Sequence, residues 1–257
     1  MPGFADHFSI IAAEYAAYRP RYPEPLFDSL AALAPRRDLA WDCATGSGQA
    51  AVGLARLFDR VIATDASRSQ VERATPQPRV TYSQASAEAS GLPAGSAALI
   101  TVAQALHWLD LPGFYAEARR VLAPGGLLAV WTYGRHRVDS GPIDALLNQF
   151  YDQIVGPYWA PERRHVESGY RTLPFPFDEL ALDVPPMVAC WTLPQMLGYM
   201  GTWSAVVRCA EVTGSNPVPA LGDRLAPHWN AGATVRRPEW TLSIKTSHRN
   251  SEMEPPL

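Results

Sequence analysis

Short, almost entirely apolar segments alternate with segments of helical periodicity through the first half of this chain. A strand that is apolar on both of its faces is typical of a parallel sheet with helices on either side. The alternation therefore predicts a doubly wound, mostly parallel α/β domain, in which each strand leads into a helix. The apolar segments are residues 39–43, 60–64, 80–82, 97–103 and 127–133.

The second half of the chain has a weaker pattern. Trp240, Leu242 and Ile244 alternate with polar residues, which predicts a last, half-buried strand. Residues 156–176 are rich in Pro, Arg and aromatic residues and are predicted as a loop, and residues 124–126 are predicted as a tight turn before the fifth strand. Helices are predicted at residues 24–34, 49–58, 68–74, 112–122, 142–154 and 194–210, with a proline-interrupted strand inside 178–191.

Composition and charge argue against several classes of partner and site. The 257 residues are 47% hydrophobic and 18% charged, which suits one domain with a real core. With a net charge of −3, neither nucleic acid nor an anionic membrane is an expected partner. No apolar segment reaches the ~20 residues of a membrane-spanning helix, and the first residues do not resemble a secretion signal, so we expect a cytoplasmic protein. Cys43, Cys190 and Cys209 are too widely spaced to predict a disulfide framework, and we expect no metal site.

A glycine-rich loop at residues 42–48 follows the first predicted strand and leads into a helix. Ligands of open α/β sheets bind at this edge of the sheet, where the backbone can approach them closely. Gly46 and Gly48 remove the Cβ atoms that would obstruct that approach. Asp65 ends the next strand, where its carboxylate would accept hydrogen bonds from both hydroxyls of a ribose.

Two cofactors compete for this loop. Residues 46–51 match the G-x-G-x-x-G/A fingerprint of dinucleotide sites, and Asp65 follows at roughly the required 20 residues. Asp42, however, places a negative charge just before the turn, which would repel a diphosphate and attract the ammonium of a methionine. Ala87 and Glu88 follow the third strand, where an adenine ring needs a small contact and an acceptor. These features favour S-adenosyl-L-methionine, and an NAD(P)-dependent oxidoreductase or a non-catalytic cofactor-binding protein stays the alternative.

Several motifs together resemble the class I S-adenosylmethionine-dependent methyltransferases, and more narrowly the type 11 group that includes trans-aconitate methyltransferase-like proteins. The resemblance implies a Rossmann-like, seven-stranded sheet in one domain over residues 1–257, divided into an N-terminal lid and helix (8–34), a cofactor-binding core (35–134), a cap (135–232) and a final strand (233–248). Ala44 stands where the family loop has its first glycine, so we expect a backbone conformation there that alanine tolerates. The motifs are residues 42–48, Asp65, 85–88, 104–108 and 120–126.

The same resemblance implies which residues bind the cofactor and which line the acceptor pocket. The cofactor-binding residues would be Tyr15, Arg19, Asp42, Ala44, Gly46, Gly48, Asp65, Ala66, Ala87, Glu88 and Gln104. The walls of the acceptor pocket would be Tyr22, Trp108, Trp131 and Trp203.

The reaction expected from these residues is methylation of a small-molecule acceptor by in-line displacement. A carboxylate acceptor needs no general base, whereas a hydroxyl or an amine would benefit from one. His107, just beyond the fourth strand, is the candidate catalytic residue if a base is used. Because no strong acid–base pair is visible in the sequence, we expect O-methylation of a carboxylic acid; Arg135 or Arg163 would suit such an acceptor if either side chain enters the pocket. The sequence predicts no oligomeric state.

Overall fold

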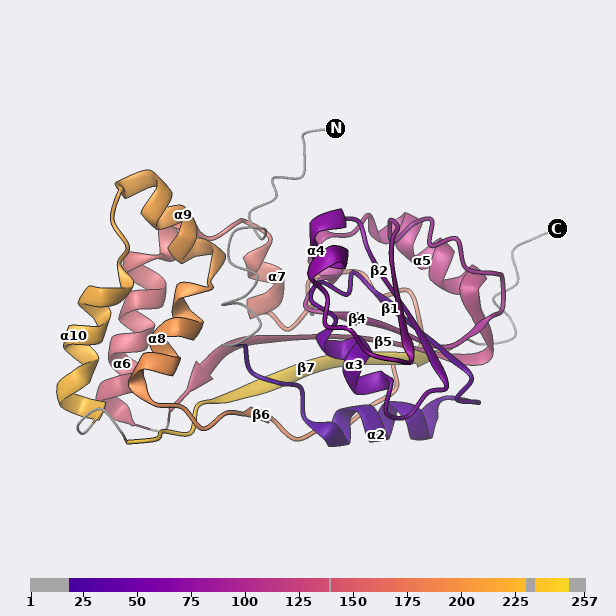
Figure 1. Ribbon diagram of the computed structural model, residues 1–257, viewed down its shortest axis with the longest axis horizontal. Coiled ribbons are helices and arrows are strands. Elements are labelled where there is room, and N and C mark those ends of the chain that lie inside the picture. Colours follow the sequence, from indigo (N-terminus) through magenta and orange to yellow (C-terminus); the bar gives the residue numbers. More distant parts are fainter. Residues whose placement is uncertain (1–18, 139, 230–233, 250–257) are drawn as a thin grey trace. The chain divides into compact units, whose positions relative to one another are not determined.

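The computed structural model describes residues 19–138, 140–229 and 234–249 (Figure 1). The contacts within the chain divide it into two compact units. The sheet unit comprises Tyr22–Gly134, Arg164–Pro186 and Thr241–Leu257. The helical unit comprises Met1–Arg21, Arg135–Arg163 and Met187–Trp240.

Among the described residues, seven strands form one sheet in the order β3-β2-β1-β4-β5-β7-β6. Strands β1 to β5 pair parallel with one another, and β6 pairs antiparallel with β7. This confirms the predicted doubly wound, mostly parallel sheet, and it puts the reversal of strand order between β1 and β4, where such folds bind ligands. The strands are β1 Leu39–Cys43, β2 Arg60–Asp65, β3 Val80–Gln84, β4 Ala97–Ala103, β5 Leu122–Arg137, β6 Met187–Val188 and β7 Glu239–His248.

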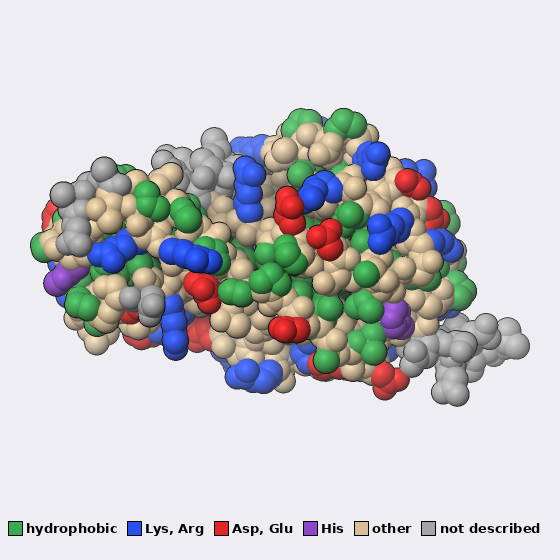
Figure 2. Space-filling view, turned by 90° about the horizontal axis from the view of Figure 1, so that it is seen from below, with side chains coloured by type: hydrophobic (Ala, Val, Ile, Leu, Met, Phe, Trp, Pro, Cys, Tyr) green, Lys and Arg blue, Asp and Glu red, His purple; other side chains and the backbone are tan. Residues whose placement is uncertain are grey.

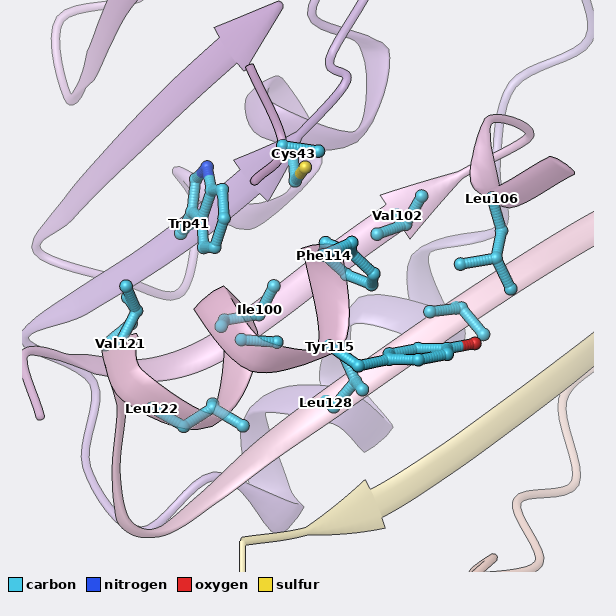
Figure 3. Packing of buried hydrophobic residues seen from close by; sticks show 14 of the residues in the cluster. Trp41, Cys43, Ile100, Val102, Leu106, Phe114, Tyr115, Val121, Leu122 and Leu128 are labelled. Atoms are coloured by element: carbon cyan, nitrogen blue, oxygen red, sulfur yellow. The ribbon is translucent and has the colours of Figure 1, made fainter. Parts of the chain in front are cut away.

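One large cluster of buried apolar residues in the sheet unit lies between the sheet and α5. Phe114, Ala118 and Val121 form one stripe of α5 and pack against Trp41 and Ile100 of the strands (Figure 3). Fully burying a side chain as large as Phe114, Val121 or Ile100 contributes about 1.5–3 kcal/mol to the stability of the unit. Helix α2 lies on the opposite side of the sheet from α5 (Figure 1). The helices of this unit are α2 Glu24–Leu33, α3 Gln49–Leu54, α4 Arg68–Arg73 and α5 Leu111–Val121, with the short helix η1 Leu106–Trp108.

The turn predicted at residues 124–126 is wrong, because these residues lie inside β5. The pairing with β4 shifts there: Ala97 lies opposite Leu122, whereas Leu99 lies opposite Leu127. The extra residues of β5 form a bulge, and Gly125 has a φ of +70°, which glycine adopts readily. The Pro-Gly-Gly sequence therefore forms an irregular part of β5 and does not precede the strand.

The helical unit departs further from the prediction. The helix predicted at 194–210 is two helices, because Trp203 has extended backbone and Thr202 donates its hydroxyl to the carbonyl of Tyr199 at 2.6 Å, a bond that competes with helix continuation. Helix α10 was not predicted, although Leu221 and Leu225 have helical spacing. The helices of this unit are α6 Gly141–Gln149 with the π-helix η2 Phe150–Ile154, η3 Gly156–Tyr158, α8 Leu193–Gly201, α9 Ser204–Thr213 and α10 Val218–Trp229. The segment predicted as a loop contains η3 and also α7 Arg163–Glu167, nearly all of which belongs to the sheet unit.

Acidic and basic side chains are interspersed over the face shown in Figure 2. Within the described ranges, every helix is too short or too polar to cross a bilayer.

Candidate functional site

The loop after β1 adopts the left-handed backbone that a close ligand approach requires. Ala44, Gly46 and Gly48 have φ values of +54°, +56° and +84°. Alanine can adopt the left-handed conformation of Ala44, at a cost of about 1 kcal/mol relative to glycine. A Cβ on Gly48 would lie 2.2 Å from the hydroxyl of Tyr82, so a larger residue would have to displace that ring and also adopt a φ of +84°. The Cβ direction of Gly46 meets no atom of the described residues within 4 Å. Among the described residues, the space beside Gly46 is therefore open.

Asp42 lies completely buried beneath this loop. One carboxylate oxygen accepts a hydrogen bond from the hydroxyl of Thr101 at 2.7 Å, and the other accepts one from Thr45 at 2.5 Å. Burial raises the pKa of Asp42 to about 6, although both hydroxyls lower it. The two threonines were not predicted as site residues; Thr45 lies within the predicted motif, but only the pairing of β1 with β4 brings Thr101 to Asp42.

Asp65 lies at the end of β2 and holds the same loop from the other side. Its two carboxylate oxygens each accept one backbone hydrogen bond, from Gly46 and from Ser67, both at 2.9 Å. Burial raises its pKa and these two bonds lower it. Each oxygen retains capacity for a further hydrogen bond, which suits a pair of ribose hydroxyls. The adjacent Ala66 is exposed, and its carbonyl accepts a hydrogen bond from Gln84 at 3.0 Å.

The segment after β3 lies against the start of α5. Ala87 is buried in the core beside this helix. Glu88 accepts a hydrogen bond from the backbone of Asp110 at 3.3 Å, and its side chain packs where a Cβ on Gly113 would lie. A carboxylate at the N-terminus of a helix is stabilised by the helix dipole, so Glu88 also caps α5.

Gln104 ties the ends of β4 and β5 together. It has a φ of +58°, its backbone N–H donates to the carbonyl of Trp131, and its side-chain amide donates to the carbonyl of Tyr133, both at 2.9 Å. The hydroxyl of Thr132 donates to the amide oxygen of Gln104. A non-glycine residue in this backbone region is strained, and such residues concentrate at functional sites.

His107 follows Gln104 in η1, at the same edge of the sheet. Its Nδ1 lies 3.0 Å from the hydroxyl of Tyr170, a hydrogen bond between two residues of the sheet unit. The ring of Trp108 lies 4.7 Å from the imidazole, centroid to centroid, and this tryptophan is 46% exposed. Tyr170 was missed, because it lies in a segment predicted as loop and reaches His107 only through the fold.

The predicted pocket residues do not all belong to the same unit. Tyr22 and Trp131 meet edge to face in the sheet unit, with 5.4 Å between ring centroids. The indole N–H of Trp131 is buried without a hydrogen-bond acceptor among the described residues. Trp203 belongs to the helical unit, where its ring lies 5.7 Å from that of Trp159. Arg19 also belongs to the helical unit, and Tyr15 lies outside the described residues.

The two arginines considered for an acceptor carboxylate both contact aromatic rings in the helical unit. Arg135 lies over the ring of Tyr151 at 4.0 Å and forms an ion pair with Asp152 at 2.6 Å. Arg163 lies over the ring of Trp159 at 4.6 Å and donates to the hydroxyl of Tyr151 at 2.8 Å. These contacts account for both guanidinium groups as stabilising elements of this unit.

The chain is similar to several known methyltransferases. The sequence profile of a methyltransferase domain family matches residues 41–130, a range that contains the loop, Asp65, Glu88 and His107. A protein of Dictyostelium discoideum described as a methyltransferase is 33% identical over 225 residues, which are 86% of each chain.

Solved structures agree with this result. A protein from Anaeromyxobacter dehalogenans, described as a type II methyltransferase, is 45% identical with a TM-score of 0.84, covering 91% of this chain and 99% of its own. The YcgJ protein of Bacillus subtilis, at 15% identity and a TM-score of 0.51 over 89% of this chain and all of its own, shares the fold.

Among sequence relatives, the methyltransferase pgmE of Aspergillus terreus is 33% identical over 157 residues, which are 55% of this chain and 47% of pgmE.

Proposed function

Because the chain belongs to the class I S-adenosylmethionine-dependent methyltransferases, in the type 11 group, we propose that it methylates an oxygen of a small-molecule carboxylic acid. When bound, S-adenosyl-L-methionine supplies an electrophilic methyl group on a sulfonium. The chain's own residues then have two tasks, which are to hold the acceptor oxygen in line with that methyl group and to exclude water.

The residues around the β1 loop fit this cofactor. Asp65 would accept the ribose hydroxyls with the lone pairs left by its two backbone bonds. The space beside Gly46, which no described residue fills, would admit a ligand close to the backbone. The charge of Asp42 beneath the loop would attract an ammonium and repel a diphosphate, which argues against the dinucleotide alternative.

The other predicted cofactor contacts complete this proposal. Ala87 and Glu88 would contact the adenine, and Gln104 would contact the methionine end. Ala44, Gly48 and Ala66 would line the backbone path beside the ligand. Tyr15 and Arg19, and the cap role of residues 135–232, stay predictions from the sequence.

The hydrogen bond between His107 and Tyr170 is the observation that supports a carboxylate as the acceptor. A histidine that removes a proton from a hydroxyl is commonly oriented by a carboxylate, which stabilises the imidazolium that forms. The Nδ1 of His107 instead meets a neutral phenol at 3.0 Å. A carboxylate acceptor needs no base, because its oxygen is already a nucleophile at neutral pH. Such an acceptor also accepts hydrogen bonds, which the buried indole N–H of Trp131 can donate.

Ligand-dependent unfolding distinguishes the cofactors. At 100 times its Kd, S-adenosylhomocysteine should stabilise the fold by about 2.7 kcal/mol, which raises Tm by about 5–10 °C for a chain of this size. NAD and NADP should leave Tm unchanged. Stabilisation by NAD or NADP alone would contradict the proposed cofactor.

Methyl transfer to a matched panel identifies the acceptor class. Each carboxylic acid is paired with its primary alcohol and its amine, and product is followed by mass spectrometry. The expected result is methyl esters from acids, without methyl ethers or methylamines. Turnover of alcohols or amines alone would contradict the acceptor class. Stabilisation by S-adenosylhomocysteine without turnover of any acceptor would favour the non-catalytic alternative.

A further inference from the structure

Tyr170 reaches His107 from a distant part of the chain. The two residues are 63 positions apart, and Tyr170 follows α7, while His107 follows β4. The tyrosine is 1% exposed, and its ring centroid lies 5.8 Å from that of the imidazole. A buried phenol at this distance is held firmly, so its hydroxyl acts on a defined atom of His107, which is Nδ1.

The backbone at Tyr170 is strained in order to place this side chain. Gly169 and Tyr170 are consecutive left-handed residues, with φ values of +61° and +62°. For a bulky residue this conformation costs roughly 1–2 kcal/mol. After α7, the backbone N–H of Gly169 donates to the carbonyl of Val166 at 2.9 Å and that of Tyr170 to the carbonyl of His165 at 2.8 Å, so Gly169 occupies the position where glycine is usual. Tyr170 keeps the left-handed backbone for one residue more. A tyrosine in such a position indicates that its side chain, rather than its backbone, is required.

The chemistry of the two groups gives the hydrogen bond a direction. A phenol is a stronger acid than the N–H of a neutral imidazole, and the imidazole lone pair is the better acceptor. We propose that Tyr170 is a positioning residue whose hydroxyl donates to Nδ1 of His107 and so keeps the imidazole hydrogen on Nε2. His107 is then a hydrogen-bond donor rather than a general base. On the proposed function, on which this role rests, Nε2–H binds a carboxylate oxygen of the acceptor.

Nitrogen NMR of the full chain, labelled with ¹⁵N-histidine at neutral pH and without acceptor, tests the tautomer. His107→Gln identifies the signals of His107 among the six histidines. The expected wild-type spectrum has Nδ1 as the unprotonated nitrogen and Nε2 as the protonated one. In Tyr170→Phe, which keeps the ring, the two shifts should converge as the tautomers mix. Protonated Nδ1 in the wild type, or an unchanged tautomer in Tyr170→Phe, would overturn the proposal.

Tyr115→Phe is the matched control. Tyr115 is also buried in the sheet unit, and its hydroxyl donates to the carbonyl of Pro174 at 2.7 Å, in the same segment that carries Tyr170. The substitution removes a hydroxyl and a hydrogen bond without touching His107. The His107 signals should stay as in the wild type, and a shift as large as that in Tyr170→Phe would show that any loosening of this segment changes the tautomer, which would also overturn the proposal.

Steady-state kinetics tests whether the His107 tautomer affects binding of the acceptor. Tyr170→Phe should raise KM for a carboxylic acid about tenfold, as for the weakening of one hydrogen bond to a charged group, with the affinity for S-adenosylhomocysteine unchanged. An unchanged KM would overturn the role in acceptor binding. The tautomer is measured without acceptor, so it decides the action of Tyr170 even if carboxylic acids prove not to be substrates.

Discussion

At the scale of single residues, a substitution of Asp65 tests the proposed cofactor site most directly. Asp65→Asn keeps the shape of the side chain but replaces one acceptor oxygen with a donor and removes the charge. Hydrogen bonds to charged groups contribute about 1.5–3 kcal/mol, so the Kd of S-adenosylhomocysteine should rise about 10- to 100-fold. Titration calorimetry measures this change.

Asp59→Asn is the control for that experiment. Asp59 is exposed at the opposite end of β2, just before the strand begins. Its substitution should leave the Kd unchanged. Equal Kd values for Asp65→Asn and the wild type would remove Asp65 from the cofactor site.

Burial of Asp42 beneath the same loop makes its ionised form unfavourable in the folded state. Its pKa of about 6 lies above the usual 3.8, so the folded state binds the proton more tightly than the unfolded state. The contribution of Asp42 to the free energy of unfolding should therefore fall as the pH rises from about 4 to about 6, by about 3 kcal/mol when both pKa values are used. Asp42→Asn removes this dependence, so its stability relative to the wild type should increase over that range. Urea denaturation at pH 4.5 and pH 7 measures the difference.

At pH 7, Asp42→Asn should lose affinity for the ligand although it gains stability relative to the wild type. Asp42→Asn should bind S-adenosylhomocysteine more weakly at pH 7, because the buried charge no longer attracts the ammonium. A variant that is both less stable than the wild type at pH 7 and unchanged in ligand binding would show that Asp42 serves only to hold Thr45 and Thr101.

At the scale of elements, Glu117 fastens the segment after β3 to α5. One of its oxygens accepts from the backbone and the hydroxyl of Ser90 at 2.8 and 2.5 Å, and both accept from Arg120 at 2.7 Å. These bonds lower the pKa of Glu117 to about 2, with Arg120 as the largest cause. Its contribution to stability is therefore present above about pH 4.5 and is lost as the pH falls toward 2.

Glu117→Gln should lower the free energy of unfolding at pH 7 by about 2–3 kcal/mol, because it leaves polar groups of a buried network imperfectly paired. Glu72→Gln is the matched control, since Glu72 forms an exposed i,i+4 pair with Arg68. That pair should contribute no more than about 0.5 kcal/mol. Equal losses in the two variants, measured by urea denaturation, would contradict the structural role of Glu117.

The elements also show what the sequence could predict. Strands β1, β2 and β4 were predicted at nearly their observed bounds, because burial on both faces leaves a continuous apolar run. The bulge at Gly125 and the helix break at Thr202 depend on backbone geometry and on a single side-chain bond, which apolar periodicity does not report.

The same limit applies to the site. Asp42, Gly46 and Asp65 were found because their order along the chain carries the signal, and the fold brings them together around one loop. Thr101 and Tyr170 were not found, because each reaches its partner from 59 or 63 residues away through strand pairing or a buried turn. Local motifs therefore predict the residues nearest the cofactor, whereas their supporting partners require the fold.

At the scale of the whole molecule, the two units contain buried titratable groups that respond to acid in opposite directions. His136 of the helical unit is buried among aromatic rings, and desolvation lowers its pKa to about 4, with Asp144 raising it. Since the unfolded imidazole titrates near 6.5, the unfolded state binds more protons between pH 6.5 and 4. His136 therefore stabilises less as the pH falls, by up to about 3 kcal/mol, whereas Asp42 in the sheet unit stabilises more.

Acidification should for this reason weaken the helical unit first. Hydrogen exchange of the full chain, corrected for intrinsic rates, should show α6, α8 and α10 losing more protection than β1 and β4 between pH 6.5 and pH 4.5. His136→Phe, which keeps an aromatic ring in contact with Trp240 but cannot be protonated, should abolish most of that difference. If the helices lose protection equally in the variant and the wild type, His136 is not the group responsible, and if both units lose protection together, the chain unfolds as one cooperative body in which the two opposing groups offset each other.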